Sequence, residues 1–431
     1  MINIYFETHG CTMNANDSEI MQGILKAAGY DIVNEERLAD IIVLNTCIVK
    51  TDKKMVARLK DLETNAKNNR QKFIVTGCMP QVELNLIEEI APSATAIIGP
   101  HFIYKIANAV QQIQNGRRVI EVGIKPRIKL GYPKLPTNSV IWITPIAEGC
   151  LGACTYCIVK FARGRLLSYP KELIVKNIEK AVKNGFKEIE ITAQDVGAYG
   201  FELGYGLPEL LHEINRIDGQ FFVRVGMINP RNVFPTLDEL ANAFSLEKIY
   251  KFLHLPVQSG DNQILQLMKR DYFVEDCIKI IEKFRKKIPE LTLSTDIIIG
   301  FPTETEEQFE NSCKLIEKIQ PDIINISRFS PRPGTEAARM KGRVLERTVK
   351  ERSRELTELR MKIGLERNQR FIGKETSALI TELGKSGTVI GRTPNYKPVV
   401  INGNSDMLGK FVNIKIIGAR PTYLLGELAS S

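Results

Sequence analysis

The sequence predicts an α/β fold followed by a small all-β domain, and three observations carry that prediction. Short apolar runs rich in Ile and Val alternate with helical patterns over residues 1 to about 115, which indicates a parallel sheet covered by helices. The alternation continues from 139 to about 330 through six strand–helix units. This is two short of a complete eight-stranded barrel, so we expect a partial, open one. Beyond 368, short apolar runs are separated by Gly, Asn and Ser, as in small all-β barrels.

The first region, residues 1–115, is read as one domain. Its apolar runs predict strands at 2–7, 41–46 and 72–77 and, between them, helices at 17–30 and 52–67. Residues 116–138, which include KPRIKLGYPKLPT, are basic and contain proline. We expect these residues to form a linker to the barrel.

The second region carries the six units of the partial barrel. Strands are expected at 140–146, 188–193, 221–226, 250–255, 291–300 and 322–329, with helices that include 171–185 and 306–319. Residues 339–367 form a charged helical connector, with ten Lys and Arg against five Asp and Glu. We assign 139–367 to this domain and 368–431 to the terminal barrel, which has eight basic residues against four acidic ones.

Composition favours a cytoplasmic protein with a polyanionic partner. The chain of 431 residues has a net charge of +9, which suits RNA, although many soluble proteins are mildly basic. No apolar run reaches the length of a membrane span, and MINIYFETHGC fits a first strand better than a signal peptide. Eight cysteines without a secretory signal indicate reduced thiols that can bind metal or do redox chemistry.

Three of these cysteines follow predicted strands of the first region. Cys11, Cys47 and Cys78 each come just after a strand, and the carboxyl ends of parallel strands form one rim where ligands bind. Each cysteine could instead be a small buried apolar residue. Their equivalent positions, two of them beside glycine, favour a metal or cluster site, and His9 is the one histidine nearby.

Three more cysteines stand in EGCLGACTYC, residues 148–157. Cys150, Cys154 and Cys157 have C-x3-C-x2-C spacing, and Gly149 and Gly152 favour a loop at the end of the first barrel strand. A structural zinc ion would need a fourth ligand. A [4Fe–4S] cluster held by three thiolates leaves one iron open to a chelating ligand such as S-adenosylmethionine, whose reductive cleavage yields an adenosyl radical.

This spacing resembles the signature of radical S-adenosylmethionine enzymes, and nearly the whole chain resembles the methylthiotransferase family. The segments that carry the resemblance are NTCIVK (45–50), GCMPQ (77–81), ARGRLLSYP (162–170), LHLPVQSGDNQILQLMKR (253–270), DIIIGFPTETEEQF (296–309) and PRPGTEAARM (331–340). GCMPQ, RVGMINP and FLHLPVQS are similar to the archaeal and eukaryotic branch. That branch methylthiolates threonylcarbamoyladenosine beside the tRNA anticodon.

The resemblance implies a Rossmann-like first domain, a radical S-adenosylmethionine core and a terminal barrel called TRAM. It makes Cys11, Cys47 and Cys78 ligands of an auxiliary [4Fe–4S] cluster, and Cys150, Cys154 and Cys157 ligands of the radical-generating one. Tyr156 is similar to the aromatic residue that packs near the adenine of the cofactor. Thr303 stands where the family usually has glycine.

The implied reaction uses two molecules of S-adenosylmethionine. One methylates a sulfur carried by the auxiliary cluster. The second is cleaved to a radical that takes hydrogen from C2 of the adenine, where the methylated sulfur is added. Methylthiolation of isopentenyladenosine in tRNA, or of an aspartate in a ribosomal protein, is the same chemistry on another substrate. A non-catalytic iron–sulfur electron carrier or RNA-binding scaffold is the alternative from another class.

Polar residues near the ends of the barrel strands are candidates for holding cofactor and substrate. They are Gln194, Asp195, Arg224, His254, Gln258 and Asp296. Each of them could equally be a structural hydrogen-bonding residue. Two other cysteines, Cys277 and Cys313, fall in helical patterns with apolar neighbours, and we expect both to pack in the core.

The basic residues after the second cysteine motif are candidates for RNA contacts. Lys160, Arg163 and Arg165 could meet phosphates near the site, or they could belong to a solvated basic face. Anticodon-loop bases are single-stranded and can be splayed into a pocket. The expected partners are therefore a tRNA anticodon stem-loop and a flavodoxin- or ferredoxin-like electron donor.

Overall fold

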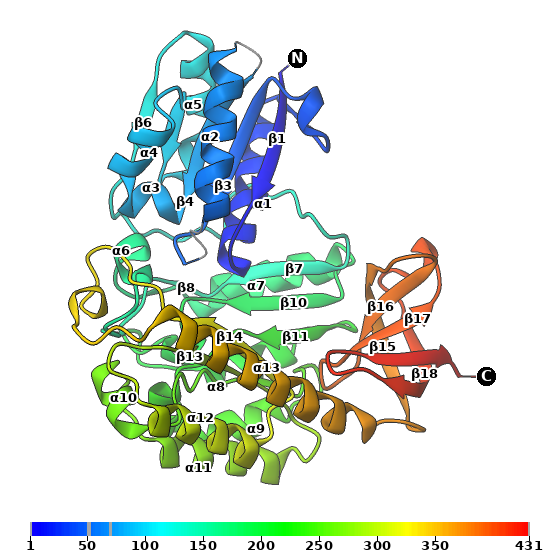
Figure 1. Cartoon of the computed structure of the whole chain (residues 1–431). Coiled ribbons are helices and arrows are strands. Elements are labelled where there is room, and N and C mark those ends of the chain that lie inside the picture. Colours follow the sequence, from blue (N-terminus) through cyan, green and yellow to red (C-terminus); the bar gives the residue numbers. More distant parts are fainter. Residues whose placement is uncertain (1, 50–52, 69–70, 430–431) are drawn as a thin grey trace.

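The computed structural model describes residues 2–49, 53–68 and 71–429, and it has a first domain, a core and a terminal barrel (Figure 1). Lys50, at the end of the 45–50 motif, and Asp52, at the start of the helix expected at 52–67, lie outside the described residues. No helix in the described part of the chain is long and apolar enough to cross a membrane.

The first domain is a parallel sheet with the order β2-β1-β3-β4-β5-β6. Its strands are β1 (Asn3–Thr8), β2 (Asp31–Val33), β3 (Ile41–Thr46), β4 (Lys72–Gly77), β5 (Ala96–Ile98) and β6 (Val119–Glu121). Its helices are α1 (Thr12–Ala27), α2 (Lys53–Lys67), α3 (Cys78–Val82), α4 (Leu84–Ile90) and α5 (Ile106–Gln114), with short 3-10 helices at Glu36–Leu38 and Ile103–Lys105. The strand order reverses between β1 and β3, and ligands bind at such switch points beyond the carboxyl ends.

The linker expected at 116–138 contains one strand, one buried lysine and a second lysine whose side chain is mostly covered. Strand β6 lies in that range and pairs with β5, so the sheet of the first domain extends into it. Lys129 is 2% exposed, and the Lys134 ammonium lies 3.0 Å from Glu19 of α1. This segment is therefore packed against the first domain.

The core has parallel strands in chain order from β7 to β14, as two three-stranded sheets β11-β10-β7 and β12-β13-β14. A bridge between Val223 and Ile249 joins them. The strands are β7 (Ile141–Pro145), β10 (Glu188–Thr192), β11 (Phe222–Val225), β12 (Phe252–His254), β13 (Thr292–Ile299) and β14 (Ile323–Arg328). Over the described residues these six strands confirm the expected partial barrel.

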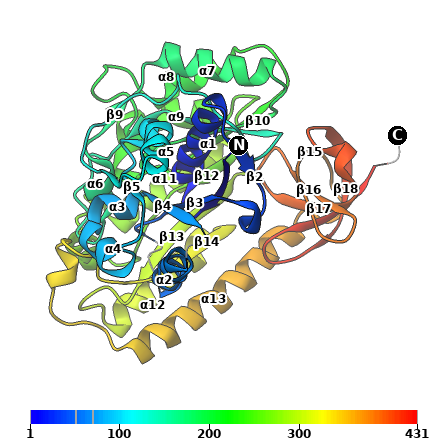
Figure 2. The same ribbon diagram turned by 90° about the horizontal axis from the view of Figure 1, so that it is seen from above.

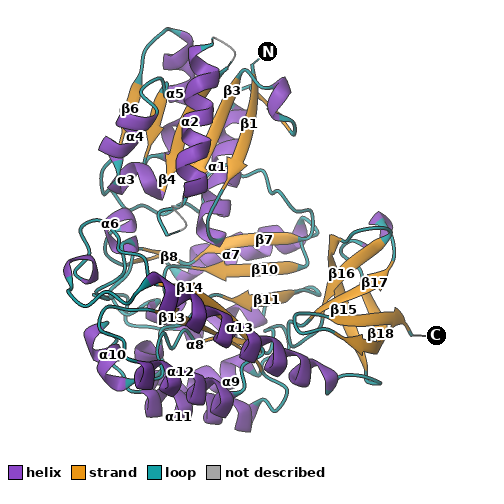
Figure 3. Cartoon of the chain, viewed as in Figure 1, coloured by secondary structure: helices purple, strands orange, loops and turns teal. Residues whose placement is uncertain are grey.

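Helices cover the outside of this barrel, and shorter elements fill its connections (Figure 3). The helices are α6 (Val159–Arg163), α7 (Lys171–Lys183), α8 (Leu207–Asn215), α9 (Leu237–Phe244), α10 (Asn262–Leu267), α11 (Val274–Lys287), α12 (Glu306–Ile319) and α13 (Glu346–Gln369). Short 3-10 helices lie at Val196–Ala198, Pro230–Asn232, Phe234–Thr236 and Ala337–Arg339. A two-stranded antiparallel sheet joins β8 (Ala147–Glu148) and β9 (Leu167–Ser168).

The two faces of the barrel strands differ in chemistry because successive side chains alternate. Outward residues such as Ile189 and Val223 are buried in the main hydrophobic cluster beneath the helices, which also holds Cys277. Inward residues are polar and remain partly accessible, among them Glu190, Arg224, His254, Asp296 and Asn325. The inner face of the open barrel is therefore a polar surface that solvent reaches.

Helix α13 leads from the core to the terminal barrel (Figure 2). That barrel is closed, with the order β15-β16-β17-β19-β18. Its strands are β15 (Glu375–Leu383), β16 (Thr388–Arg392), β17 (Pro398–Asn402), β18 (Phe411–Ala419) and β19 (Leu424–Leu428), with a 3-10 helix at Ser405–Met407.

Thr303, the departure from the family pattern, has a φ of 72°. That left-handed backbone explains why glycine suits the position.

The loop between β16 and β17 docks the terminal barrel onto the core. Tyr396 in this loop places its ring 4.8 Å from that of Tyr250 and 4.9 Å from that of Phe252. Lys397 of the same loop donates to Asp322 Oδ1, which also accepts from Arg367 of α13. The buried Asp322 carboxylate thus holds barrel, connector and core together, and the two cations hold its pKa below its usual value.

Replacing Asp322 with Asn is expected to destabilise the chain by about 3–5 kcal/mol, because it leaves two largely buried cations without their counter-charge. The lost stability should appear as a lower urea midpoint at neutral pH. Asp406→Asn, on the exposed surface of the same barrel, is the matched control and should change little. Equal midpoints for the two variants would contradict the assigned role of Asp322.

Glu188 of β10 lies at the same interface, where its Oε1 accepts from the Tyr396 hydroxyl at 3.4 Å, and it makes the stability of the fold depend on pH. Burial, and then the neighbouring Glu190, raise the pKa of Glu188 from 4.5 to about 7. The folded state therefore holds this proton more tightly than the unfolded chain, and the resulting stabilisation is lost as pH rises from about 4.5 to about 7. Glu188→Gln should gain roughly 3 kcal/mol on the wild type across that window. A difference that is constant from pH 4.5 to 8 in urea unfolding would contradict this.

Candidate functional site

The first cysteine set, Cys11, Cys47 and Cys78, lies at the carboxyl ends of β1, β3 and β4, which are neighbours in the sheet. Cys11 is the N-cap residue of α1, Cys47 follows β3 directly, and Cys78 begins α3. Cys47 and Cys78 are buried and Cys11 is exposed. The strand order thus confirms the expectation that these three cysteines share one rim, and this rim faces the core (Figure 1).

Two glycines allow the backbone of this rim to close up. Gly10 has a φ of 124°, and a Cβ atom there would lie 2.6 Å from the Asn14 amide and 3.1 Å from Cys47 Cβ. Gly77 has a φ of 97°, and a Cβ atom would lie 2.3 Å from Thr46 O. Only glycine fits both the conformation and the space, so these residues bring the turns that carry Cys11 and Cys78 against the segment that carries Cys47.

Asn14 connects the three segments of the first cysteine set. Its amide nitrogen donates to His9 O at 2.8 Å and to Thr46 O at 2.9 Å. Its carbonyl oxygen lies 3.5 Å from Cys78 Sγ. Asn14 is 1% exposed, so one buried amide fixes all three turns relative to one another.

The second cysteine set, Cys150, Cys154 and Cys157, lies in the loop between β8 and α6, as the glycines predicted. Gly149 N donates to Gln194 Oε1 at 2.6 Å, and Thr155 N donates to Met268 O at 3.1 Å. A Cβ atom on Gly152 would lie 3.3 Å from Cys150 Sγ and 3.7 Å from Cys154 Sγ. The loop is therefore held at both ends, with two of its sulfurs beside Gly152.

Arg270 is a buried cation beside the second cysteine set. It is 4% exposed, and its Nη1 donates to Cys154 Sγ at 3.2 Å. Its other N–H groups reach neutral oxygens of Tyr272, Asn229 and Pro256. Among the described residues no carboxylate forms an ion pair with it, so thiolate charge at this loop is the natural counter-charge for Arg270.

Burial disfavours the thiolate form at three of the six cysteines. It raises the pKa of Cys78 to about 11 and that of Cys157 to about 11, and it raises the pKa of Cys150 as well. Metal binding displaces such protons. In the described part of the chain, no three His, Cys, Asp or Glu side chains converge on a single metal ion. Three thiols per set, with N–H donors aimed at sulfur, fit an iron–sulfur cluster with an open iron better than closed zinc.

Several polar candidates have structural partners. Gln194 supports the cysteine loop through Gly149, and Asp195 caps the 3-10 helix Val196–Ala198 through Gly197 N. Gln258 bonds β13 through its backbone, with a φ of 79°. We therefore interpret these residues as structural supports at the carboxyl ends of the core strands. Whether Gln194 also contacts a cofactor stays a prediction.

His254 and Asp296 come together on the inner face of the barrel. His254 Nε2 lies 3.0 Å from Asp296 Oδ1, which also accepts from Asn325 Nδ2 at 2.7 Å. These hydrogen bonds lower the pKa of Asp296 despite its burial. Arg224 is on the neighbouring strand β11, with its guanidinium 5.6 Å from the centre of the Phe252 ring. This face offers hydrogen-bonding groups and a cation to a ligand in the barrel.

Tyr156 packs against an apolar cluster that includes Ile264, Met268 and Phe301. The burial of the phenol raises its pKa well above the usual value. Tyr156 therefore provides an apolar ring beside the second cysteine set, which is compatible with packing against an adenine.

The three basic candidates after this loop divide into two groups. Lys160 and Arg165 are exposed and can meet a phosphate backbone. Arg163 is 1% exposed and cannot make the phosphate contact expected of it. Its guanidinium instead donates to Cys78 Sγ and to acidic and amide groups of the first domain. The expectation for Arg163 was wrong because spacing alone does not reveal which side of a short helix is covered.

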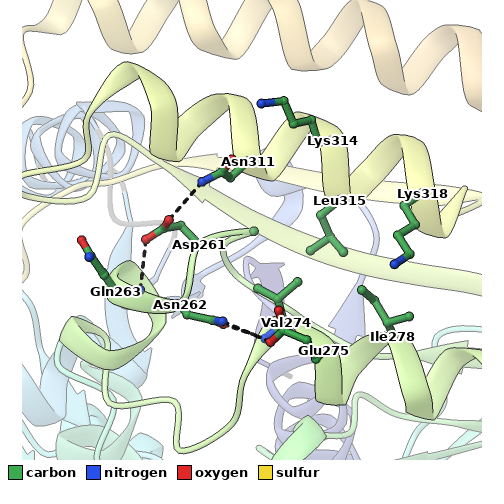
Figure 4. Close-up of a pocket in the computed structure, with 11 residues that line it drawn as sticks. Asp261, Asn262, Gln263, Val274, Glu275, Ile278, Asn311, Lys314, Leu315 and Lys318 are labelled. Atoms are coloured by element: carbon green, nitrogen blue, oxygen red, sulfur yellow. Dashed lines mark hydrogen bonds between the residues drawn. The ribbon is translucent and has the colours of Figure 1, made fainter.

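A surface hollow of about 500 Å³ lies between α10, α11 and α12, lined by residues such as Asn262, Lys314 and Lys318 (Figure 4). Asp261 at its edge caps α10 and accepts from Asn311. The hollow is on the outer helical layer and includes none of the cysteines.

Comparison with known proteins defines the class of the chain. Residues 3–99 match the uncharacterized protein family UPF0004, residues 144–316 the radical SAM superfamily and residues 369–429 the TRAM domain. The radical S-adenosylmethionine methyltransferase TsrM from Kitasatospora setae has a similar fold, with a TM-score of 0.59 and 13% identity over 78% of this chain and 74% of that one. The chain thus contains a radical S-adenosylmethionine domain at residues 144–316.

Relatives define the family more closely. The chain is 48% identical, over the full length of both, to a probable threonylcarbamoyladenosine tRNA methylthiotransferase of Pyrococcus abyssi. It is 35% identical to the Drosophila melanogaster threonylcarbamoyladenosine tRNA methylthiotransferase, over 99% of this chain and 77% of that one. It is 39% identical, over 98% of both, to a tRNA-2-methylthio-N(6)-dimethylallyladenosine synthase of Carboxydothermus hydrogenoformans. The chain belongs to the radical S-adenosylmethionine methylthiotransferase family.

Proposed function

We propose that this enzyme methylthiolates C2 of N6-threonylcarbamoyladenosine next to the anticodon of tRNA. The observation that carries the proposal is the pair of three-cysteine sets, one at the rim of the first domain and one on the loop of the core. Five relatives named for threonylcarbamoyladenosine are 40–48% identical over at least 99% of this chain, and two more are 34–35% identical. The relative named for dimethylallyladenosine is 39% identical, and its substrate is the alternative that the experiment distinguishes.

Each cysteine set has a role in this proposal. Cys150, Cys154 and Cys157 would hold the [4Fe–4S] cluster that binds S-adenosylmethionine, and Cys11, Cys47 and Cys78 would hold an auxiliary [4Fe–4S] cluster. Bound together, these groups supply the adenosyl radical and the sulfur for transfer. Arg270 places its positive charge beside Cys154, and Gln194 holds the loop in place through Gly149. His254, Asp296 and Arg224 offer polar contacts for cofactor or nucleoside on the inner face, and Tyr156 offers an apolar ring.

The proposed partners are a tRNA anticodon stem-loop, which exposed basic residues support, and an electron-donor protein. Lys160 and Arg165 are exposed beside the second cysteine set, where they would meet phosphates of an anticodon stem-loop. The terminal barrel would contribute further contacts to RNA. A flavodoxin- or ferredoxin-like protein of the cytoplasm would supply the electron. The reduced state of the eight cysteines that this role requires suits that compartment.

Nucleoside mass spectrometry tests the proposal directly. Anaerobic enzyme with reconstituted clusters, dithionite and S-adenosylmethionine is incubated with tRNA that carries threonylcarbamoyladenosine or isopentenyladenosine. The expected product is 2-methylthio-threonylcarbamoyladenosine, with little conversion of the other tRNA. A methylthio product on isopentenyladenosine alone, or on a ribosomal protein and on neither tRNA, would overturn the substrate assignment.

A further inference from the structure

A group of buried charges lies where the first domain, the 116–138 segment and the core meet. Asp17 comes from α1, Lys129 from the 116–138 segment, Glu148 from β8 and Arg163 from α6. We refer to these four residues as the charged bridge. All of them are nearly inaccessible, with at most 2% of any residue exposed. Two carboxylates and two cations balance, so the bridge as a whole is neutral.

Arg163 makes the central contacts of the charged bridge. Its Nη1 donates to Asp17 Oδ2 at 2.7 Å and to Glu148 Oε1 at 2.9 Å. Lys129 Nζ donates to the same two carboxylates, at 2.9 Å each. The bridge therefore joins the first domain to the core through charge-assisted hydrogen bonds, which fix direction as well as distance.

The remaining N–H groups of Arg163 reach the first cysteine set. Its Nε donates to Cys78 Sγ at 3.2 Å. Its Nη2 donates at 2.7 Å to Asn14 Oδ1, and Asn14 is the residue that ties together the turns bearing Cys11, Cys47 and Cys78. One guanidinium thus contacts one sulfur of the first cysteine set and the amide that fixes its geometry.

The backbone next to Arg163 contacts the second cysteine set. It ends α6, the helix that follows Cys157, and the next residue, Gly164, accepts from Cys150 N at 3.2 Å. Glu148 lies on β8, the strand that leads into the same loop. Helix α6 also packs into the first domain, where Ile158 and Ala162 share an apolar cluster with Cys78 and Met79. Both cysteine sets are therefore attached to one short segment, whose residues Ile158, Ala162 and Arg163 are buried.

A role limited to domain stability does not explain this arrangement. Well-packed apolar residues hold an interface as firmly as buried ion pairs do, without the cost of desolvating charges. Stability also does not require the hydrogen bond from Arg163 Nε to the Cys78 thiol. Hydrogen bonds to cluster sulfurs and nearby positive charge stabilise the reduced cluster, and precise placement of two reacting centres controls the rate of transfer between them.

We propose that Arg163 is a positioning residue that fixes the auxiliary cluster on Cys11, Cys47 and Cys78 against the radical loop and raises the reduction potential of that cluster. The part that concerns transfer rests on the proposed function. The part that concerns the cluster does not, because its potential can be measured without tRNA.

The first test uses protein in which Cys150, Cys154 and Cys157 are all replaced with Ala, so that only the first cysteine set can hold a cluster. Redox titration followed by electron paramagnetic resonance gives the potential of that cluster. Arg163→Met should shift it to a more negative value, and Arg163→Lys should shift it less, because charge is kept while the fork of donors is lost. Arg352→Lys is the matched control, a buried arginine of α13 that pairs with Glu304 and Glu306, and it should leave the potential unchanged.

The second test uses the chain with all six cysteines. At unchanged iron content, Arg163→Lys should keep S-adenosylmethionine cleavage, while the amount of 5′-deoxyadenosine formed per methylthio product rises by up to roughly 100-fold. Arg352→Lys should keep the wild-type ratio. A purely structural role would lower both activities together and leave the ratio unchanged.

Three outcomes would overturn the proposal. They are an unchanged potential in Arg163→Met, an unchanged product ratio in Arg163→Lys, and loss of the auxiliary cluster from Arg163→Lys with the fold intact by circular dichroism. The last outcome would assign Arg163 to assembly of the site. If wild-type enzyme transfers no methylthio group to tRNA, the proposed function fails, and the potential measurement still decides the role of Arg163 at the cluster.

Discussion

Replacing Cys11 with Ala is expected to abolish methylthio transfer to tRNA, while dithionite-driven cleavage of S-adenosylmethionine continues at close to the wild-type rate. Cys11 lies on the rim of the first domain, whereas the loop with Cys150, Cys154 and Cys157 is held by Gln194, Met268 and Gly164 of the core. Loss of a thiol at the rim therefore leaves the radical-generating loop intact. Methylthio nucleoside and 5′-deoxyadenosine are quantified in the same anaerobic reaction.

Cys313→Ala is the matched control for this variant. Cys313 packs against the main hydrophobic cluster on α12, away from both sets, and its replacement should preserve both products. The assigned role of Cys11 fails if Cys11→Ala still makes the methylthio nucleoside.

Replacing Cys154 with Ala is expected to remove both products, down to the level seen without enzyme. The change takes away one thiolate of the second cysteine set and also the sulfur that accepts from Arg270 Nη1. Arg270 then keeps only neutral partners in a buried place, which favours local rearrangement of the loop. The measurement is the yield of 5′-deoxyadenosine from reduced, reconstituted protein.

Iron analysis separates this outcome from unfolding. Cys154→Ala should retain the iron held by the first cysteine set, and its circular dichroism should match that of the wild type. Persistent 5′-deoxyadenosine formation by Cys154→Ala would show that the second cysteine set is not the site of cleavage.

Much of this organisation can be predicted from sequence because it depends on local patterns. The apolar runs at 41–46 and 72–77 coincide with β3 and β4, and a helix was expected at 306–319, where α12 lies. Cysteines placed just after such strands reach one rim in any parallel sheet that makes those strands neighbours. Glycine beside Cys11, Cys78 and Cys150 marks the turns that the rim and the loop require.

The contacts that join the sites could not be predicted in the same way. Arg163 contacts Asp17 and Cys78 across the boundary between two domains. The spacing of residues along the sequence does not predict contacts between domains. Asn14 and Arg270 were missed for the same reason, since each acts on cysteines far away along the chain. The sequence predicts a linker where β6 lies, because the sheet pairs only three residues there, Val119 to Glu121. Three residues are too few to show an alternating pattern.

The central claim is that two separate three-cysteine sets each hold a four-iron cluster, and iron analysis combined with Mössbauer spectroscopy tests it most directly. Reconstituted wild-type protein should hold about eight iron atoms per chain. Replacing Cys11, Cys47 and Cys78 with Ala should leave about four, and so should replacing Cys150, Cys154 and Cys157. A wild-type value near four that one triple replacement abolishes and the other leaves unchanged would contradict the claim.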